Sequence, residues 1–118
     1  MGECAATKVR PRYSTEALRK AVVVRSQEKE WRRRNNQLFQ REVVEYAVNE
    51  LNHERRFSLQ PAIERIRWRS HVDSQGEDVK INDRYKAIWA RLLLQRYPEM
   101  EQYLEIRPAV FDLIKPSW

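Results

Sequence analysis

The stretch Gln37–Glu54, QLFQREVVEYAVNELNHE, is the clearest indication of how this chain folds. Its apolar side chains recur at intervals of three and four residues, which places them along one side of an α-helix. They are Leu38, Phe39, Val43, Tyr46, Ala47 and Leu51, and Glu50 is the polar residue in the same stripe. The pattern therefore predicts an amphipathic helix over 37–54 that buries this stripe in a core.

A further helix is expected before this stretch. Ser14 or Thr15 is a suitable N-cap for it, because a hydroxyl oxygen can accept a hydrogen bond from a free backbone N–H of the first turn. The β-branched run at 22–24 leaves a short strand as an alternative. Asn35 and Asn36 either cap the 37–54 helix or interrupt one longer helix.

Helices are also expected after this stretch. One is predicted over 59–69, because Pro61 fits its first turn. Another runs from Asn82 or Asp83, either of which can cap it, to Tyr97, where the following proline disfavours helical backbone. Two shorter helices are expected to follow, over 98–104 and 108–114.

Residues 65–72 carry a second, competing pattern. Apolar or small residues alternate there with basic ones, which is the periodicity of a β-strand. Together with the turn-forming residues at 73–76 and the apolar pair at 79 and 81, this pattern indicates a small β-hairpin near residues 68–81. We expect a helix that ends near Arg69, followed by a small hairpin or a loop.

Length and composition fit a mainly α protein. The chain has 118 residues, of which 42% are hydrophobic and 34% are charged, so one domain is expected. We predict a compact bundle of four to five helices over residues 14–118, preceded by a flexible basic arm over residues 1–13. Neither a membrane-spanning run nor a signal-peptide core is visible, so we expect a cytoplasmic protein with no membrane partner.

The charge is unevenly distributed and consists mainly of arginine. The net charge is +6, and the segment from Lys8 to Arg34 holds ten basic residues against three acidic ones. Seventeen of the 23 basic residues are arginine, whose planar fork of donors suits phosphate and carboxylate groups. An anionic partner is therefore expected.

Three groups of basic residues are candidate nucleic-acid contacts. They are the arm with Lys8, Arg10 and Arg12; the run Arg32, Arg33 and Arg34; and the set Arg65, Arg67 and Arg69. The run of three spreads around a helix and cannot face one groove, but it can still neutralise a phosphate backbone. The last set forms one stripe on a strand, whereas on a helix Arg65 and Arg69 share a face and Arg67 points elsewhere.

Trp68 lies within the last set of arginines. A tryptophan there can stack on an unpaired base, but a tryptophan near Ile63 and Ile66 is more typical of a core position.

Enzymatic sites are weakly indicated. The chain has two glycines and one cysteine, which excludes glycine-rich phosphate loops and cysteine-rich zinc sites. His53 and His71 have no ligand at metal-binding spacing. Asp78 and Lys80 resemble part of a metal-dependent nuclease centre, but the match is short and a hydrated turn explains it better. We expect no catalysis, no cofactor and no metal.

The segment from Tyr97 to Trp118 is rich in aromatic residues. These side chains either close the core or form a surface for a protein partner or a homodimer. The sequence thus predicts a small, basic, non-enzymatic, regulatory nucleic-acid-binding protein that contacts mainly the backbone of DNA. The alternative is an adaptor or inhibitor that docks on an acidic protein surface.

Overall fold

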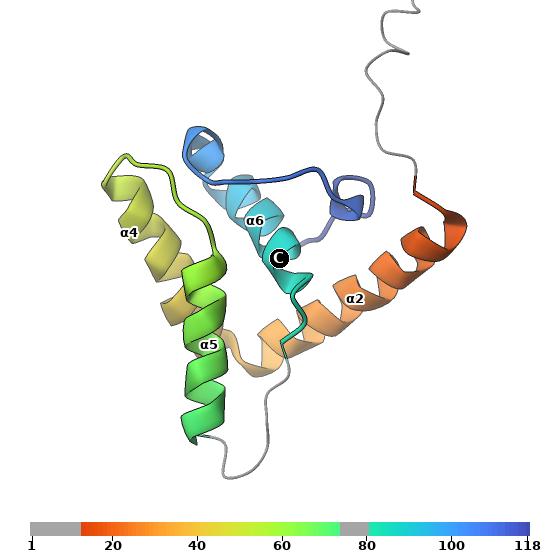
Figure 1. Cartoon of the computed structure of the whole chain (residues 1–118), viewed down its shortest axis with the longest axis horizontal. Coiled ribbons are helices and arrows are strands. Elements are labelled where there is room, and N and C mark those ends of the chain that lie inside the picture. The colour runs from red at the N-terminus through yellow and green to blue at the C-terminus, as the bar shows by residue number, and fades with distance from the viewer. Residues whose placement is uncertain (1–12, 74–80) are drawn as a thin grey trace, which may run out of the picture.

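The chain is mainly helical (Figure 1), as the sequence predicts, in a computed structural model that describes residues 13–73 and 81–118. The longer helices are α2 (Thr15–Arg34), α4 (Tyr46–Asn52), α5 (Gln60–Asp73) and α6 (Tyr85–Arg96). The shorter elements are α3 (Asn36–Phe39), the π-helical segment η1 (Gln40–Glu45) and the 3-10 turns η2 (Pro98–Gln102) and η3 (Val110–Asp112).

Helix α2 begins and ends at side chains that satisfy free backbone groups. Ser14 is the N-cap, and its hydroxyl oxygen accepts a hydrogen bond from the backbone N–H of Ala17 at 3.0 Å. At the other end, the backbone N–H and the side-chain amide of Asn35 both donate to the carbonyl of Trp31 at 2.9 Å. Asn35 therefore separates α2 from α3. Residues 22–24 are helical, so the strand alternative is wrong there.

The helix predicted over 37–54 is present as the consecutive segments α3, η1 and α4. Phe39, Val43 and Ala47 have no exposed surface, as the apolar stripe predicts. The wider turn of the π-helix adds one residue to the helical repeat, so the three successive residues 42–44 are all buried. The helix ends near His53, and Glu54 then turns the chain with a left-handed φ of 51°.

The hairpin predicted near residues 68–81 is not borne out. Residues 68–73 continue α5, whereas residues 74–80 lie outside the described part of the chain. Ala62, Ile63 and Ile66 follow helical spacing and are at most 1% exposed, so burial of this stripe prevails over the local alternation. The β-pairing among the described residues is one parallel bridge between Phe57 and Leu104.

The last helix and the segment after it also differ in detail from prediction. Helix α6 begins at Tyr85, after a turn in which the Asn82 side chain accepts from the Arg84 backbone N–H at 2.9 Å. It ends before Pro98, as predicted. The two short helices expected after it are reduced to the 3-10 turns η2 and η3.

The core is built around α6, against which α2, η2 and η3 pack (Figure 1). Trp89 is fully buried, and the centroids of the Trp31 and Phe39 rings each lie 5.4 Å from its own. Met100 and Phe111 are buried from the C-terminal side, so the aromatic-rich segment closes the core. Among the described residues, no helix is long and apolar enough to cross a membrane.

Candidate nucleic-acid interface

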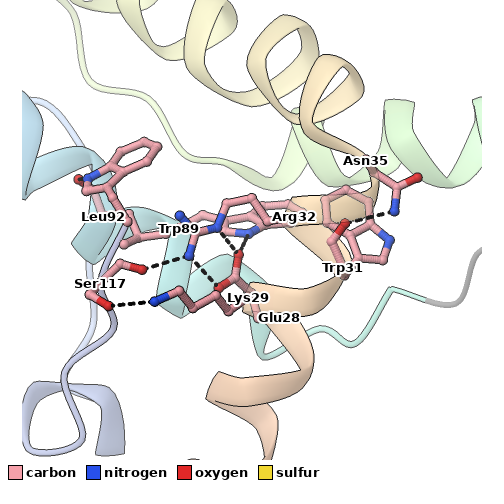
Figure 2. A network of polar contacts seen from close by, with 9 residues as sticks. Glu28, Lys29, Trp31, Arg32, Asn35, Trp89, Leu92 and Ser117 are labelled. Atoms are coloured by element: carbon pink, nitrogen blue, oxygen red, sulfur yellow. Dashed lines mark hydrogen bonds and ion pairs between the residues drawn. The ribbon is translucent and has the colours of Figure 1, made fainter.

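Arg32 lies in the protein core and is ion-paired there (Figure 2). Its Nε donates to Oε2 of Glu28 at 2.8 Å, and its Nη2 donates to Oε1 at 3.3 Å. The same Oε2 accepts from the indole Nε1 of Trp89 at 2.9 Å, and Glu28 has no exposed surface. Arg32 Nη2 also donates to the carbonyl of Ser117 at 2.8 Å. This network joins α2, α6 and the C-terminal segment.

The position of Arg32 does not suit the backbone contact that the sequence predicts for it. The residue is 7% exposed, and its guanidinium lies 5.8 Å from the centroid of the Phe39 ring and 5.5 Å from that of Trp118. A guanidinium held in this way is already satisfied by a carboxylate and a carbonyl. We therefore assign Arg32 a structural role.

Arg33 and Arg34 lie on the surface at the end of α2 and share one carboxylate. Oε2 of Glu30 is 2.6 Å from Nη2 of Arg33 and 2.7 Å from Nε of Arg34. Hydrogen bonds from Arg33 and then Arg34 lower the pKa of Glu30 to about 2. The two arginine side chains remain about 70% exposed. Such exposed pairs contribute little energy, so a phosphate can replace the carboxylate.

The three arginines of α5 contact different partners. The guanidinium of Arg65 lies 5.3 Å from the centroid of the Tyr46 ring. Nε of Arg69 is 2.9 Å from the buried carboxylate of Glu42, on η1. Arg67 forms ion pairs with Glu64, at 3.5 Å, and with Asp83. Because α5 is a helix, these residues do not form the single stripe that a strand would give.

The remaining predicted contacts cannot be placed. Lys8, Arg10 and Arg12 lie outside the described residues, as do Asp78 and Lys80 of the nuclease alternative.

A row of basic residues borders the buried side of α2. Arg25, Lys29 and Arg33 are spaced by four residues, so they lie on one face of the helix next to the buried Glu28 and Arg32. Arg25 is half-buried, whereas the other two are exposed. Among the described carboxylates, none forms an ion pair with Arg25 or Lys29.

The C-terminal segment adds to this row because α2 and α6 hold it in place. Arg25 donates to the carbonyl of Lys115 at 3.2 Å, and Lys29 donates to the hydroxyl of Ser117 at 3.4 Å. From α6, Gln95 donates to the carbonyl of Pro116 at 2.9 Å. These contacts place the exposed ammonium of Lys115 beside the row on α2, where Arg25, Lys29 and Lys115 line a hollow of about 350 Å³ together with Glu28.

Next to it, a hollow of about 520 Å³ is lined by basic, amide and aromatic side chains. Its lining residues are Lys29, Arg32, Arg33, Asn36, Gln40, Arg96 and Trp118, none of which is acidic. The guanidinium of Arg96 stacks on the Trp118 ring at 3.6 Å from its centroid, and the Trp118 indole N–H donates to the carbonyl of Leu92 at 2.9 Å. Arg96 is thereby fixed at the rim of this hollow.

We call Arg25, Lys29, Arg33, Arg96 and Lys115 the basic face. It combines three stretches far apart in the chain, and of its members only Arg33 was a predicted contact. The spacing of Arg25, Lys29 and Arg33 was a usable signal in the sequence, because four-residue steps place side chains on one helix face. Arg96 and Lys115 carried no such signal, since tertiary contacts bring them to α2.

A separate cleft, of about 580 Å³, has mixed charge. Arg56, Lys86 and Arg107 line it together with Asp83 and Glu105. Its fourth basic residue, Arg91, is paired with the carboxylate of Asp112 at 3.1 Å. This mixture suits an anionic ligand less well than the basic face does.

The described residues contain no cluster of three or more side chains that could hold a metal ion. Comparison with known proteins adds no functional information, since no family model, curated protein or solved structure matches this chain.

Proposed function

We propose that this protein binds nucleic acid through the basic face, without catalysis and mainly by contacts to the phosphate backbone. The observation that carries the proposal is the hollow shared by α2, α6 and the C-terminal segment. Basic side chains line it and acidic ones do not, although Arg32 and Arg33 are themselves paired with the α2 carboxylates Glu28 and Glu30. Arg96 and Lys29 have no carboxylate partner among the described residues.

The dimensions of the basic face suit a phosphate backbone. Arg25 and Arg33 are eight residues apart on α2, which corresponds to about 12 Å along the helix axis. Each phosphate that a cation neutralises releases condensed counterions, so binding strengthens as the salt concentration falls. Asn36 and Gln40 at the edge of the hollow can donate further hydrogen bonds to phosphate oxygens.

The adaptor alternative has less support from the fold. The large apolar and aromatic residues between 97 and 118 were its main candidate surface, but Met100, Leu104 and Phe111 are buried, and Tyr97, Tyr103 and Trp118 are partly buried against the core. Ile106 and Leu113 remain 36% and 47% exposed, which is a small apolar contribution for an interface.

The test removes three cations of the basic face together, as Lys29→Gln, Arg33→Gln and Arg96→Gln. Binding to a labelled duplex and a labelled single strand is measured by fluorescence anisotropy from 50 to 300 mM salt. We expect affinity to fall roughly tenfold or more at low salt. The slope of log K against log salt should flatten by about one for each lost cation that contacts a phosphate.

A matched control removes three exposed cations elsewhere, as Arg56→Gln, Arg84→Gln and Arg107→Gln. The control variant loses three positive charges, as many as the basic-face variant. None of its three residues is ion-paired to a described carboxylate, so their removal breaks no such pair. Equal losses in the two variants would refute a localised site. If the wild-type protein binds neither polymer, the nucleic-acid proposal is wrong and the adaptor becomes the better hypothesis.

A further inference from the structure

We propose that the outer face of α5 is a base-stacking site centred on Trp68, which makes single-stranded nucleic acid the preferred ligand. This inference rests on the proposed function and specifies its substrate. It concerns a surface on a different helix from the basic face.

The exposure of Trp68 is unusual in this molecule. Its surface is 64% exposed, whereas Trp31 is 8% exposed and Trp89 is fully buried. The core position that the sequence favoured for Trp68 is therefore wrong. Helix α5 buries Ala62, Ile63 and Ile66 along its inner stripe, and Trp68 lies on the opposite side. An indole ring exposed to water offers a large flat apolar face with a polar N–H at its edge, and it can therefore stack on a planar ligand.

The neighbours of Trp68 supply positive charge. Arg65, three residues earlier, shares the helix face with it, and Arg69 follows it directly. Both arginines are exposed, yet each is held by a partner on the neighbouring helical segment. Within the described part of the chain, no guanidinium or aromatic ring stacks on the Trp68 indole. The ring is thus free to accept a base beside Arg65, whose guanidinium has no carboxylate partner among the described residues, and next to Arg69, which is paired with Glu42.

This combination favours a single strand over a duplex. An unpaired base can stack on an exposed indole while its flanking phosphates contact arginine, and such stacking tolerates any base sequence. The bases of a duplex are already stacked on one another, so a flat exposed ring on a helix cannot reach their faces. Tryptophan and arginine also anchor protein interfaces, and a protein partner is therefore the competing outcome.

The experiment compares Trp68→Ala with Trp68→Phe. Affinity for a 12-nucleotide oligo-dT and for a hairpin duplex of equal phosphate number is measured by anisotropy. Alanine should weaken oligo-dT binding about 5- to 150-fold, whereas phenylalanine keeps a stacking ring and should stay within about threefold of wild type. Duplex binding should be unchanged in both variants. Saturating oligo-dT should also quench part of the wild-type tryptophan emission, and this part should be lost in Trp68→Phe.

The outcomes separate this inference from the proposed function. If Trp68→Ala binds oligo-dT as tightly as wild type while loss of the basic face weakens binding, the stacking site is wrong and the function stands. If neither Trp68→Ala nor the triple variant of the basic face changes binding, both proposals fail. Because Trp68 is exposed, the alanine variant should fold. Should its helical circular dichroism be lost, Trp68→Leu replaces it, and retention of full affinity by leucine would refute stacking.

Discussion

Replacing Glu28 with glutamine would leave the guanidinium of Arg32 in the core without its counter-charge. The carboxylate accepts two hydrogen bonds from Arg32, at 2.8 and 3.3 Å, and one from Trp89 at 2.9 Å. A glutamine has one carbonyl oxygen, so it can satisfy only part of this set. It also turns an amide N–H₂ toward donors that need an acceptor.

The magnitude follows from burial. The Glu28 side chain is 0% exposed and that of Arg32 is 8% exposed, so water cannot replace the lost interactions. Removing one partner of a buried ion pair costs about 3–5 kcal/mol. For a domain of this length, about 3–4 °C of melting temperature corresponds to each kcal/mol. We therefore expect Glu28→Gln to lower the midpoint by about 10–20 °C.

The assay is thermal and urea unfolding followed by circular dichroism, with two comparison variants. In Glu28→Gln combined with Arg32→Met no unpaired charge is buried, so more than half of the lost stability should return. Glu30→Gln breaks an exposed pair of similar geometry and should leave the midpoint nearly unchanged. If the unfolding free energy of Glu28→Gln lies within about 1 kcal/mol of the wild-type value, the structural role assigned to Arg32 is refuted.

Three further predictions concern surface residues. Glu30→Gln should raise affinity for nucleic acid about two- to fivefold at low salt, measured by anisotropy, because Arg33 and Arg34 lose a competing carboxylate. Partial burial raises the pKa of Asp112, but the hydrogen bonds from Arg91 and from the Ala109 backbone N–H, with the charge of Arg91, outweigh it and lower the pKa. The ionised carboxylate therefore stabilises the fold at a pH above its unfolded pKa. This stabilisation is lost as the pH falls through the folded pKa. Asp112→Asn should accordingly lower the free energy of unfolding in urea at pH 7, by less than about 1 kcal/mol for this half-exposed carboxylate, and should leave it unchanged below about pH 3. Glu54→Gly should raise the unfolding free energy by about 0.5–1 kcal/mol in the same assay, because glycine adopts the φ of 51° without a steric penalty.

The fold was predictable where one periodicity dominates and less so where two compete. The stripe of Phe39, Val43 and Ala47 fits the spacing of a helix and not that of a strand, and all three residues are buried. Residues 65–72 satisfy the spacing of a helix and of a strand, and local sequence cannot choose between them. Contacts with distant segments decide, because only the helix buries Ile63 and Ile66 together.

The candidate site was predictable in charge but not in position. Arg32, Arg33 and Arg34 are identical in type, yet a rotation of 100° per residue places Arg32 in the core and the other two in water. The spacing of Glu28 and Arg32 was the available signal of an ion pair. It did not show burial, since exposed helices carry the same pairs.

The buried pair of Glu28 and Arg32 also links the stability of the fold to the basic face. An apolar pair of similar volume would fill the same space, but it would not fix the rotation of α2 about its axis as the hydrogen bonds to Trp89 and Ser117 do. A rotation by one residue would carry Lys29 toward the core and separate it from the C-terminal segment. The core hydrogen bonds therefore set which cations of α2 meet those of α6 and of the C-terminal segment, so the surface charge pattern depends on an ion pair that is largely buried beneath it.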